Sequence, residues 1–353
     1  MVDPTAVGSI NPGAPMSFSR STPTTPMPPT LLVSATEAGA DAETPPSPAV
    51  PEVTGSIPDT VAATETPERF ELPPEAVGPI ELRQAAADGD AKAQFEIAAI
   101  YTEGRAVEQD FAEAAKWYER SAAQGFVPAQ YRLGNLYEAG TGVEQDFDLA
   151  RLWYQRSAEA GNRMAMHNLA ALHAGGQLGD QQFELAAEWF EQAAQRGMTD
   201  SQFNLGMLYA RGLGVEQDFE QSYKWFSLAA LAGDKDAAQA RDDIAKSLSA
   251  EAASRVGELV KGWKAEAIDL EANFAPIGTW SDRFDPGETI TSKEVIIRVQ
   301  QALAKLGFDV GTPDGVAGPK TAEAVRAFER GTGMPESGKV NPRLLAVLGS
   351  QPV

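Results

Sequence analysis

The chain has 353 residues, no cysteine, 43% hydrophobic residues and a formal net charge of −21 at pH 7. The lack of cysteine excludes disulfides, thiolate metal sites and cysteine nucleophiles. The acidic balance argues against a nucleic-acid partner, because phosphate binding rests on clustered Lys and Arg. No apolar run of roughly 18 residues is present, so the sequence predicts no membrane-spanning helix.

Residues 1–80 are acidic and rich in proline. They hold 16 of the 24 prolines, and their apolar residues follow neither a helical nor a strand period. Such a segment cannot bury enough apolar surface to offset the entropy lost on ordering. We therefore expect a disordered, extended tether. Its start has no basic stretch followed by an apolar core and so is not a secretory signal. Either the protein is cytosolic, or an export or membrane-anchoring segment is expected upstream of this chain.

A period of 36 residues dominates the next part of the chain. Columns of identical or similar residues share this spacing, the clearest being four tryptophans: Trp117, Trp153, Trp189 and Trp225. The same offset joins five glycines and four phenylalanines: Gly89, Gly125, Gly161, Gly197, Gly233, Phe111, Phe147, Phe183 and Phe219. A fixed period of this length is the sequence signature of a solenoid of stacked repeats.

Each 36-residue unit is predicted to form two helices. In the second unit, Ala129, Leu133 and Tyr137 lie on one helical face, and the loop 140–145 separates them from a second helix capped by Asp146. A single hairpin leaves apolar surface uncovered and needs the next one to bury it. We predict four full units and a partial fifth over residues 81–248, followed by a capping helix over 249–267.

The third unit departs from the pattern. His167 and His173 stand where the other units have aromatic residues, and Gln182 replaces the Asp that caps the second helix. We expect this unit to be the least regular.

The unit resembles the Sel1-like repeat, a relative of the tetratricopeptide repeat. The resemblance rests on Ala129-Gln130-Tyr131, Leu133-Gly134, Tyr137, Gly140, Gly142-Val143, Gln145-Asp146-Phe147, Ala150, Trp153-Tyr154, Ala158 and Gly161. It implies an all-α solenoid that binds a protein partner on its concave face, which the first helix of each unit lines. The positions implied on that face are Phe95, Glu103, Tyr131, Asn135, Glu138, His167, Phe203, Met207 and Arg211.

Residues 268–290 are predicted to be a connecting arm, and residues 291–353 a small domain of three helices. The domain resembles the peptidoglycan-binding domain of cell-wall hydrolases through a run of motif residues: Asp314, Gly315, Gly318, Pro319, Thr321 and Phe328. The resemblance implies peptidoglycan as the ligand. Two positions depart from the family pattern, because Ala317 replaces an aromatic residue and Glu329 a glutamine, and both departures predict weaker binding to the wall.

The order of these parts resembles the periplasmic region of PodJ-type polar localisation factors of alphaproteobacteria. It implies a periplasmic location, as part of a protein that is anchored in the inner membrane upstream of this chain and located at the cell pole.

The sequence favours binding over catalysis. The only histidines, His167 and His173, lie in columns that are otherwise aromatic, and no nucleophile motif, phosphate loop or metal-spaced cluster is present. We expect no catalytic residue, metal or cofactor. The resulting hypothesis is a non-catalytic scaffold that links a protein partner to peptidoglycan. Two alternatives are an accessory or regulatory subunit of a cell-wall hydrolase and a cytosolic Sel1-like adaptor.

Overall fold

The computed structural model describes residues 70–281 and 285–349, and within these ranges every regular element is helical. The helices of the repeat region and its ends are η2 (Glu75–Val77), α1 (Ile80–Ala87), α2 (Ala91–Glu103), α3 (Phe111–Ala123), α4 (Val127–Ala139), α5 (Phe147–Glu159), α6 (Arg163–Gly175), α7 (Phe183–Gln195), α8 (Thr199–Arg211), α9 (Phe219–Leu231), α10 (Lys235–Ala245) and α11 (Ala250–Gly262). The arm and C-terminal domain contain α12 (Leu270–Asn273), α13 (Lys293–Lys305), α14 (Pro319–Gly331) and α15 (Pro342–Leu348). The all-α fold class is thus confirmed.

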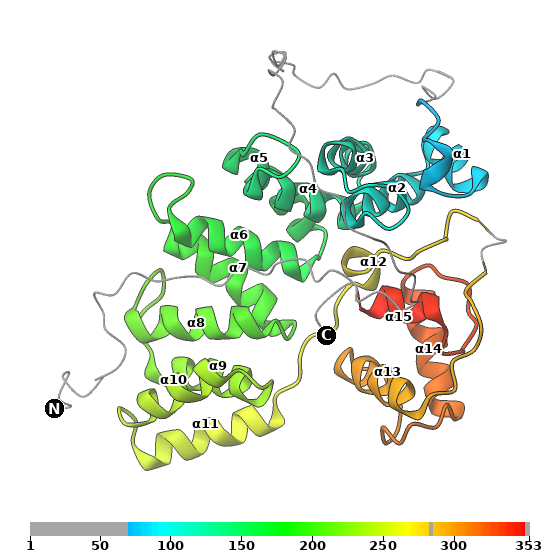
Figure 1. The fold of residues 1–353 in the computed structure, drawn as a ribbon. Helices are drawn as coiled ribbons and strands as arrows, with labels where there is room; N and C mark the ends of the chain where they lie inside the picture. Colours follow the sequence, from blue (N-terminus) through cyan, green and yellow to red (C-terminus); the bar gives the residue numbers. More distant parts are fainter. Residues whose placement is uncertain (1–69, 282–284, 350–353) are drawn as a thin grey trace, which may run out of the picture.

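Four hairpins of two 13-residue helices each, α2–α3 to α8–α9, form the body of the solenoid. Figure 1 shows them following one another along an arc from α1 to α11, with α13, α14 and α15 on its open side. The Asp expected to cap the second helix does so: the Asp146 side chain accepts a hydrogen bond from Leu149 N at 2.8 Å. Because the unit length is constant, successive hairpins repeat the same contacts along the arc.

The loop inside each hairpin is held by a repeated glutamine. Gln109, Gln145, Gln181 and Gln217 each donate a hydrogen bond from Nε2 to a backbone oxygen seven residues earlier, at 2.8–2.9 Å. In the second unit the same loop reaches the preceding hairpin. Gly142 has φ +74°, and a Cβ placed on it would lie 2.3 Å from the backbone carbonyl of Phe111. Only glycine fits this contact between neighbouring units.

Small residues and large aromatic ones alternate in the core. Ala114, Ala150, Ala186 and Ser222 are fully buried at equivalent positions of the second helices, which lets helices approach closely. Trp117 and Trp225 are buried, while Trp153 and Trp189 are half-buried and pack against the cores of neighbouring units. The tryptophan column therefore fills the space between hairpins.

The third unit is more regular than expected, since α6 and α7 have the same length as their counterparts. Gln182 makes no capping hydrogen bond, as its sequence predicts. Instead its side-chain oxygen lies 2.6 Å from His173 Nδ1. The two departures from the repeat pattern thus pair with each other and keep the hairpin closed.

The N-terminal boundary differs from the prediction. The expected disorder of residues 1–69 lies outside the described residues, but residues 70–80 do not belong to a tether. Phe70 N donates to Ala87 O at 2.9 Å, and Val77 is buried in the core of the first repeat. Helix α1 packs against α2 and covers the apolar face that would otherwise begin the stack.

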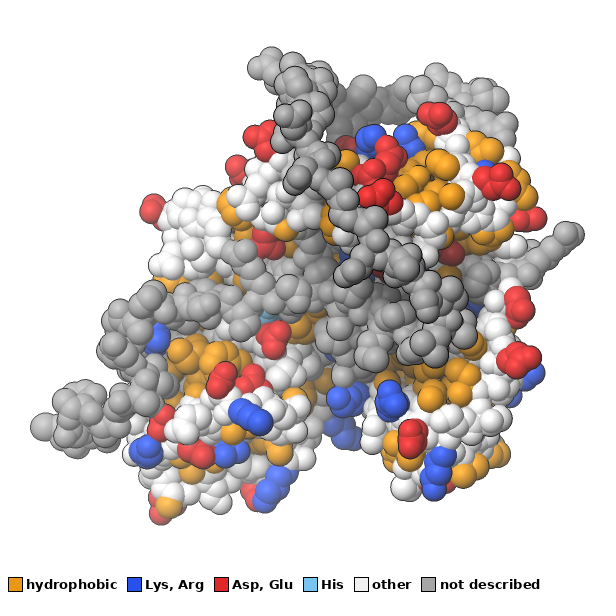
Figure 2. Space-filling model, viewed as in Figure 1, with side chains coloured by type: hydrophobic (Ala, Val, Ile, Leu, Met, Phe, Trp, Pro, Cys, Tyr) orange, Lys and Arg blue, Asp and Glu red, His pale blue; other side chains and the backbone are white. Residues whose placement is uncertain are grey.

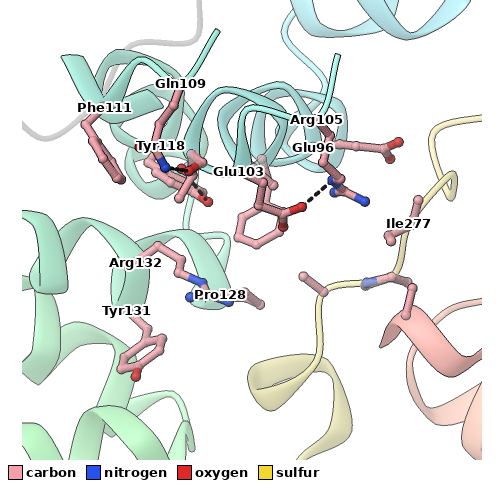
Figure 3. Close-up of a pocket in the computed structure, with 16 residues that line it drawn as sticks. Glu96, Glu103, Arg105, Gln109, Phe111, Tyr118, Pro128, Tyr131, Arg132 and Ile277 are labelled. Carbon is pink, nitrogen blue, oxygen red and sulfur yellow. Dashed lines mark hydrogen bonds and ion pairs between the residues drawn. The ribbon is translucent and has the colours of Figure 1, made fainter. Parts of the chain in front are cut away.

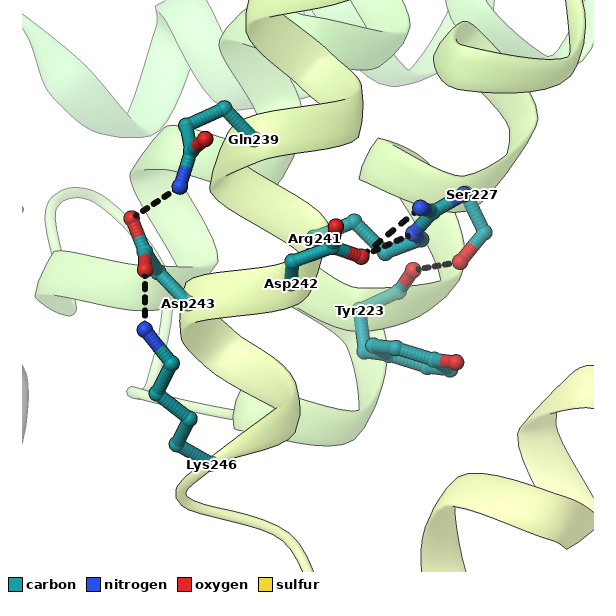
Figure 4. Close-up of polar contacts among 7 residues, drawn as sticks. All are labelled: Tyr223, Ser227, Gln239, Arg241, Asp242, Asp243 and Lys246. Atoms are coloured by element: carbon teal, nitrogen blue, oxygen red, sulfur yellow. Dashed lines mark hydrogen bonds and ion pairs between the residues drawn. The ribbon is translucent and has the colours of Figure 1, made fainter.

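The far end of the solenoid is closed by α10 and α11, and α11 packs against α9. Polar side chains of α10 are satisfied locally (Figure 4): Asp243 accepts hydrogen bonds from Lys246 Nζ at 2.6 Å and Gln239 Nε2 at 3.3 Å. The capping helix ends at Gly262, not at the predicted 267, and extended chain follows it. The stack of hairpins is therefore closed at this end by α10 and α11, as a solenoid requires.

The arm is not a free linker. It turns back and follows the solenoid toward its first repeat, passing the turns between successive hairpins. Glu266 N donates to Gln195 O at 2.8 Å, and further along the Asn162 side chain donates to Ala272 O at 2.7 Å. Asn273 completes this contact: its Oδ1 accepts from Arg163 N at 3.0 Å and its Nδ2 donates to Gly161 O at 3.0 Å. The arm is thus anchored through buried hydrogen bonds between residues about 110 positions apart.

The C-terminal domain begins earlier than residue 291. Phe274 of the arm is fully buried in its core, with the ring centroid 5.1 Å from that of Phe328. Ile268, Leu270 and Ile277 also pack against this core. The three predicted helices are present as α13, α14 and α15, but the arm completes the core that they enclose.

Candidate functional site

Three of the expected concave-face residues are buried. Tyr131, Glu138 and His167 are 1%, 7% and 0% exposed. His167 packs edge-on against Phe190, and its Nδ1 lies 2.7 Å from Ser201 Oγ. These residues hold the repeats together, and their assignment as exposed partner contacts is corrected here.

Asn135 and Glu138 belong to a polar network between the second and third units. The Tyr154 hydroxyl lies 2.7 Å from Glu138 Oε2 and 2.8 Å from Asn135 Oδ1, and Asn168 Nδ2 donates to the same Asn135 oxygen at 3.1 Å. Burial raises the pKa of Tyr154 well above its ordinary value, and the nearby Glu138 carboxylate adds to the effect. The phenol therefore stays protonated as a hydrogen-bond donor.

Phe203, Met207 and Arg211 lie on α8, far along the arc. Phe203 and Met207 pack against the core around Phe226, with the Phe203 and Phe226 ring centroids 5.5 Å apart. All three side chains are half-buried, and burial lowers the pKa of Arg211. The structure does not bring them together with the positions of the first two units.

A pocket of about 310 Å³ does bring together Phe95, Glu103 and Tyr131. It lies between α2, α4, the arm and α15 (Figure 3). Sequence reasoning missed its other walls, which come from the solenoid and from the arm and C-terminal domain: Glu96, Ala99, Thr102, Arg105, Gln109, Phe111, Tyr118, Pro128, Arg132, Ala275, Pro276, Ile277 and Ala346. Since its volume falls at the lower end of the range for ligand sites, this pocket is the candidate functional site.

The pocket is apolar with a few charges at its rim. Glu103 forms an ion pair with Arg105. Burial raises the pKa of Glu103, and the charges of Arg105 and Arg132 oppose that rise. Arg132 makes no hydrogen bond or ion pair with the described residues, and its guanidinium lies 6.0 Å from the Tyr131 ring centroid. The pocket therefore offers aromatic and aliphatic walls together with the Arg132 guanidinium, which is close enough to Glu103 to act on its charge but forms no ion pair among the described residues.

A sequence signal for the missed residues was present in the repeat. Glu96 and Arg132 occupy the same register position of the 36-residue unit, where the third and fourth units have Asn168 and Asn204. The members of this column have different surroundings: Asn168 and Asn204 are buried, whereas Glu96 and Arg132 line the pocket. The change of residue type along the column therefore indicates where the first two units differ from the last two.

The motif residues of the C-terminal domain build one turn around a buried glutamine. Gln300 is 1% exposed, and its Nε2 lies 3.2 Å from Asp314 Oδ1 and 3.0 Å from Thr321 Oγ1. Its Oε1 accepts from Gly315 N at 2.9 Å. The hydrogen bond from Val316 N to the Asp314 carboxylate lowers the pKa of Asp314. These motif residues thus shape the backbone.

The remaining motif residues are also structural. Gly318 and Pro319 begin α14, and Phe328 is fully buried in the domain core. Glu329, one of the two departures, is 3% exposed, and its carboxylate accepts hydrogen bonds from Ser337 N at 2.6 Å and Gly338 N at 2.9 Å. It holds an internal loop, while Ala317 is exposed. Of the two departures, only Ala317 therefore changes the surface that a ligand would meet.

The described residues contain no group of three or more His, Asp or Glu side chains placed to hold a metal ion. None of the helices within those residues is long and apolar enough to cross a membrane. On the face shown in Figure 2, acidic and basic side chains are interspersed over the repeats and the C-terminal domain.

The fold defines a helical-hairpin solenoid with a small helical domain docked on it, and family comparisons identify both parts. Sel1 repeats match residues 91–126, 127–162, 163–198 and 199–234. The family described as "Putative peptidoglycan binding domain" matches residues 292–348. The chain therefore contains four Sel1 repeats and a C-terminal domain that matches the peptidoglycan-binding family. Both are typically non-catalytic binding modules, so the chain combines a protein-interaction scaffold with a cell-wall module.

Two crystal structures are similar to the chain. A Sel1 repeat protein from Oxalobacter formigenes is 37% identical over 45% of this chain and 46% of its own, with a TM-score of 0.42. A protective antigen of uropathogenic Escherichia coli strains, which displays an SLR fold, is 25% identical over 71% of this chain and 55% of its own, with a TM-score of 0.43. The chain thus spans about half the length of each. A comparison with curated proteins gave no match.

Proposed function

We propose that the chain is a non-catalytic periplasmic scaffold that holds a protein partner on its first two repeats and contacts peptidoglycan through its C-terminal domain. In this role it couples a polar assembly to the cell wall. The observation that supports the proposal most directly is the junction between the two modules. The anchored arm holds the C-terminal domain beside the pocket of the first repeats, so one chain carries both binding surfaces next to each other.

The pocket has the composition of a protein-interaction site. Phe95 and Arg132 are of the residue types that are enriched where partners bury most of their binding energy. The pocket also lies where the charge pattern of the repeat changes. These features support a partner that inserts apolar side chains between α2 and α4.

Binding to the wall is tested by cosedimentation with purified peptidoglycan sacculi. We expect the full chain to pellet with sacculi and a chain that ends at residue 267 to stay in the supernatant, because only the former keeps the C-terminal domain with its arm. The truncation removes Phe274 together with α13, α14 and α15, so no partial core remains. Equal pelleting of both chains, or of neither, would contradict the proposed role of the domain.

A further inference from the structure

The docked arm closes the surface that the proposed function assigns to the partner. Ala275, Pro276 and Ile277 form one side of the pocket, and Ala346 of α15 lines it as well. A specific protein interface buries on the order of 800 Å² on each partner. A pocket of about 310 Å³ admits a few side chains and no more of a partner. A larger contact with α2 and α4 therefore requires the arm to leave.

At the first repeat, the described part of the arm is held by one carboxylate and by Trp280, whose ring packs against the apolar core of that repeat. Glu96 Oε2 accepts a hydrogen bond from Gly278 N at 2.9 Å and another from Trp280 Nε1 at 2.7 Å. These bonds join α2 to a segment more than 180 residues later. The charged groups that act on Glu96 are Arg105, from the loop after α2, and Arg343, from α15. Glu96 thus lies where the first repeat, the arm and the C-terminal domain meet.

We propose that Glu96 is the latch of an autoinhibitory switch: in its neutral form it holds the arm and the C-terminal domain on the first repeats, and in its ionised form it favours their release. Release uncovers the α2 and α4 surface for the partner. The proposal rests on the proposed function, because it concerns the regulation of the same site. The anchor at Asn162 and Asn273 sets how easily the arm leaves and does not titrate.

The sign of the pH dependence follows from the environment of Glu96. Burial raises its pKa above the ordinary 4.5, and the bonds from Gly278 and Trp280 and the charges of Arg105 and Arg343 only partly oppose this. The docked state therefore binds more protons than the released state. Docking is strongest near and below pH 4.5 and weakens as the pH rises through the raised pKa.

The switch is tested by a distance measurement on the full chain. The chain has no cysteine, so labels at Glu119→Cys on α3 and Gln301→Cys on α13 report only the separation of the two modules. We expect one short distance at pH 5 and a growing, broader population of longer distances at pH 8. Glu96→Gln, which keeps a hydrogen-bond acceptor without the charge, should remain docked at both pH values. Asn273→Ala should shift both samples toward release.

A matched control is Glu113→Gln. Glu113 lies on α3 outside the pocket, pairs with Lys116 and makes no hydrogen bond to the described part of the arm. This variant should show the same distances as the unmodified chain at both pH values. Identical distances at pH 5 and pH 8, or a Glu96→Gln variant that still opens with rising pH, would overturn the latch.

A second readout tests the covering of the partner surface. Ala99 lines the pocket. The only thiol of an Ala99→Cys variant can be labelled either with a small maleimide or with a polymer-linked maleimide of about 5 kDa. The ratio of the large to the small reagent's rate should rise several-fold between pH 5.5 and pH 8. A constant ratio would contradict autoinhibition. Neither readout involves sacculi or a partner, so the latch and the proposed function fail or succeed separately.

Discussion

Replacing Gly142 with alanine is expected to cost the solenoid about 2–5 kcal/mol of unfolding free energy. The new Cβ would lie 2.3 Å from the Phe111 carbonyl carbon and oxygen, so the loop of the second unit would have to move away from the first. Positive φ adds conformational strain. Urea unfolding followed by far-UV circular dichroism measures the loss.

Gly125→Ala is the matched control for this prediction. Gly125 also has positive φ, +87°, but a Cβ there would meet no atom within 4 Å. Its substitution should cost only the strain, about 1–2 kcal/mol. If both variants lose the same stability, the contact between neighbouring units contributes nothing and the account of the loop inside each 36-residue unit is wrong.

Replacing Phe274 with alanine is expected to destabilise the C-terminal domain by about 3–5 kcal/mol. The side chain is fully buried and packs edge-on against Phe328, although it lies outside the region that matches the domain family. A domain of this size has little stability to spare. Denaturant unfolding of the full chain should show the C-terminal transition moving to lower urea, with the solenoid transition retained.

The neighbouring Asn273→Ala variant separates the two roles of the arm. Asn273 binds the solenoid backbone at Gly161 and Arg163 and does not belong to the apolar core of the domain. The Asn273→Ala substitution should therefore loosen docking. It should change the unfolding free energy of the C-terminal domain by no more than about 1 kcal/mol, which is typical of changes outside a core. If Phe274→Ala has as small an effect, the domain begins where its family match begins.

The sequence predicted the hairpins well because their packing recurs every 36 residues. Residues such as Ala150 and Asp146 show their role through their columns, and the structure confirms both. The same columns also predicted which unit would lack a cap. They did not predict that His173 and Gln182 would pair, since that contact exists only where both columns change together.

The candidate site was harder to predict, because some of its lining residues belong to the arm and the C-terminal domain, which reach the first repeat only after the chain turns back. Residues such as Ile277 and Ala346 reach the first repeat only after the arm reverses direction, and no local pattern specifies that path. Consensus aromatics such as Tyr131 were expected to face a partner, but stacking against Tyr154 buries that ring. The variable column of Glu96 and Arg132 was the better guide to the site.

The central claim, that one chain connects a partner to the wall, is tested most directly by a bridging experiment. A photo-crosslinking residue at position 99 in the pocket would be used to trap the partner in cells that express the full chain, and the crosslinked species would then be mixed with sacculi. We predict that it pellets, and that the equivalent species from a chain ending at residue 267 stays soluble. A crosslinked species that remains in the supernatant with the full chain, while the uncrosslinked chain pellets, would contradict the claim.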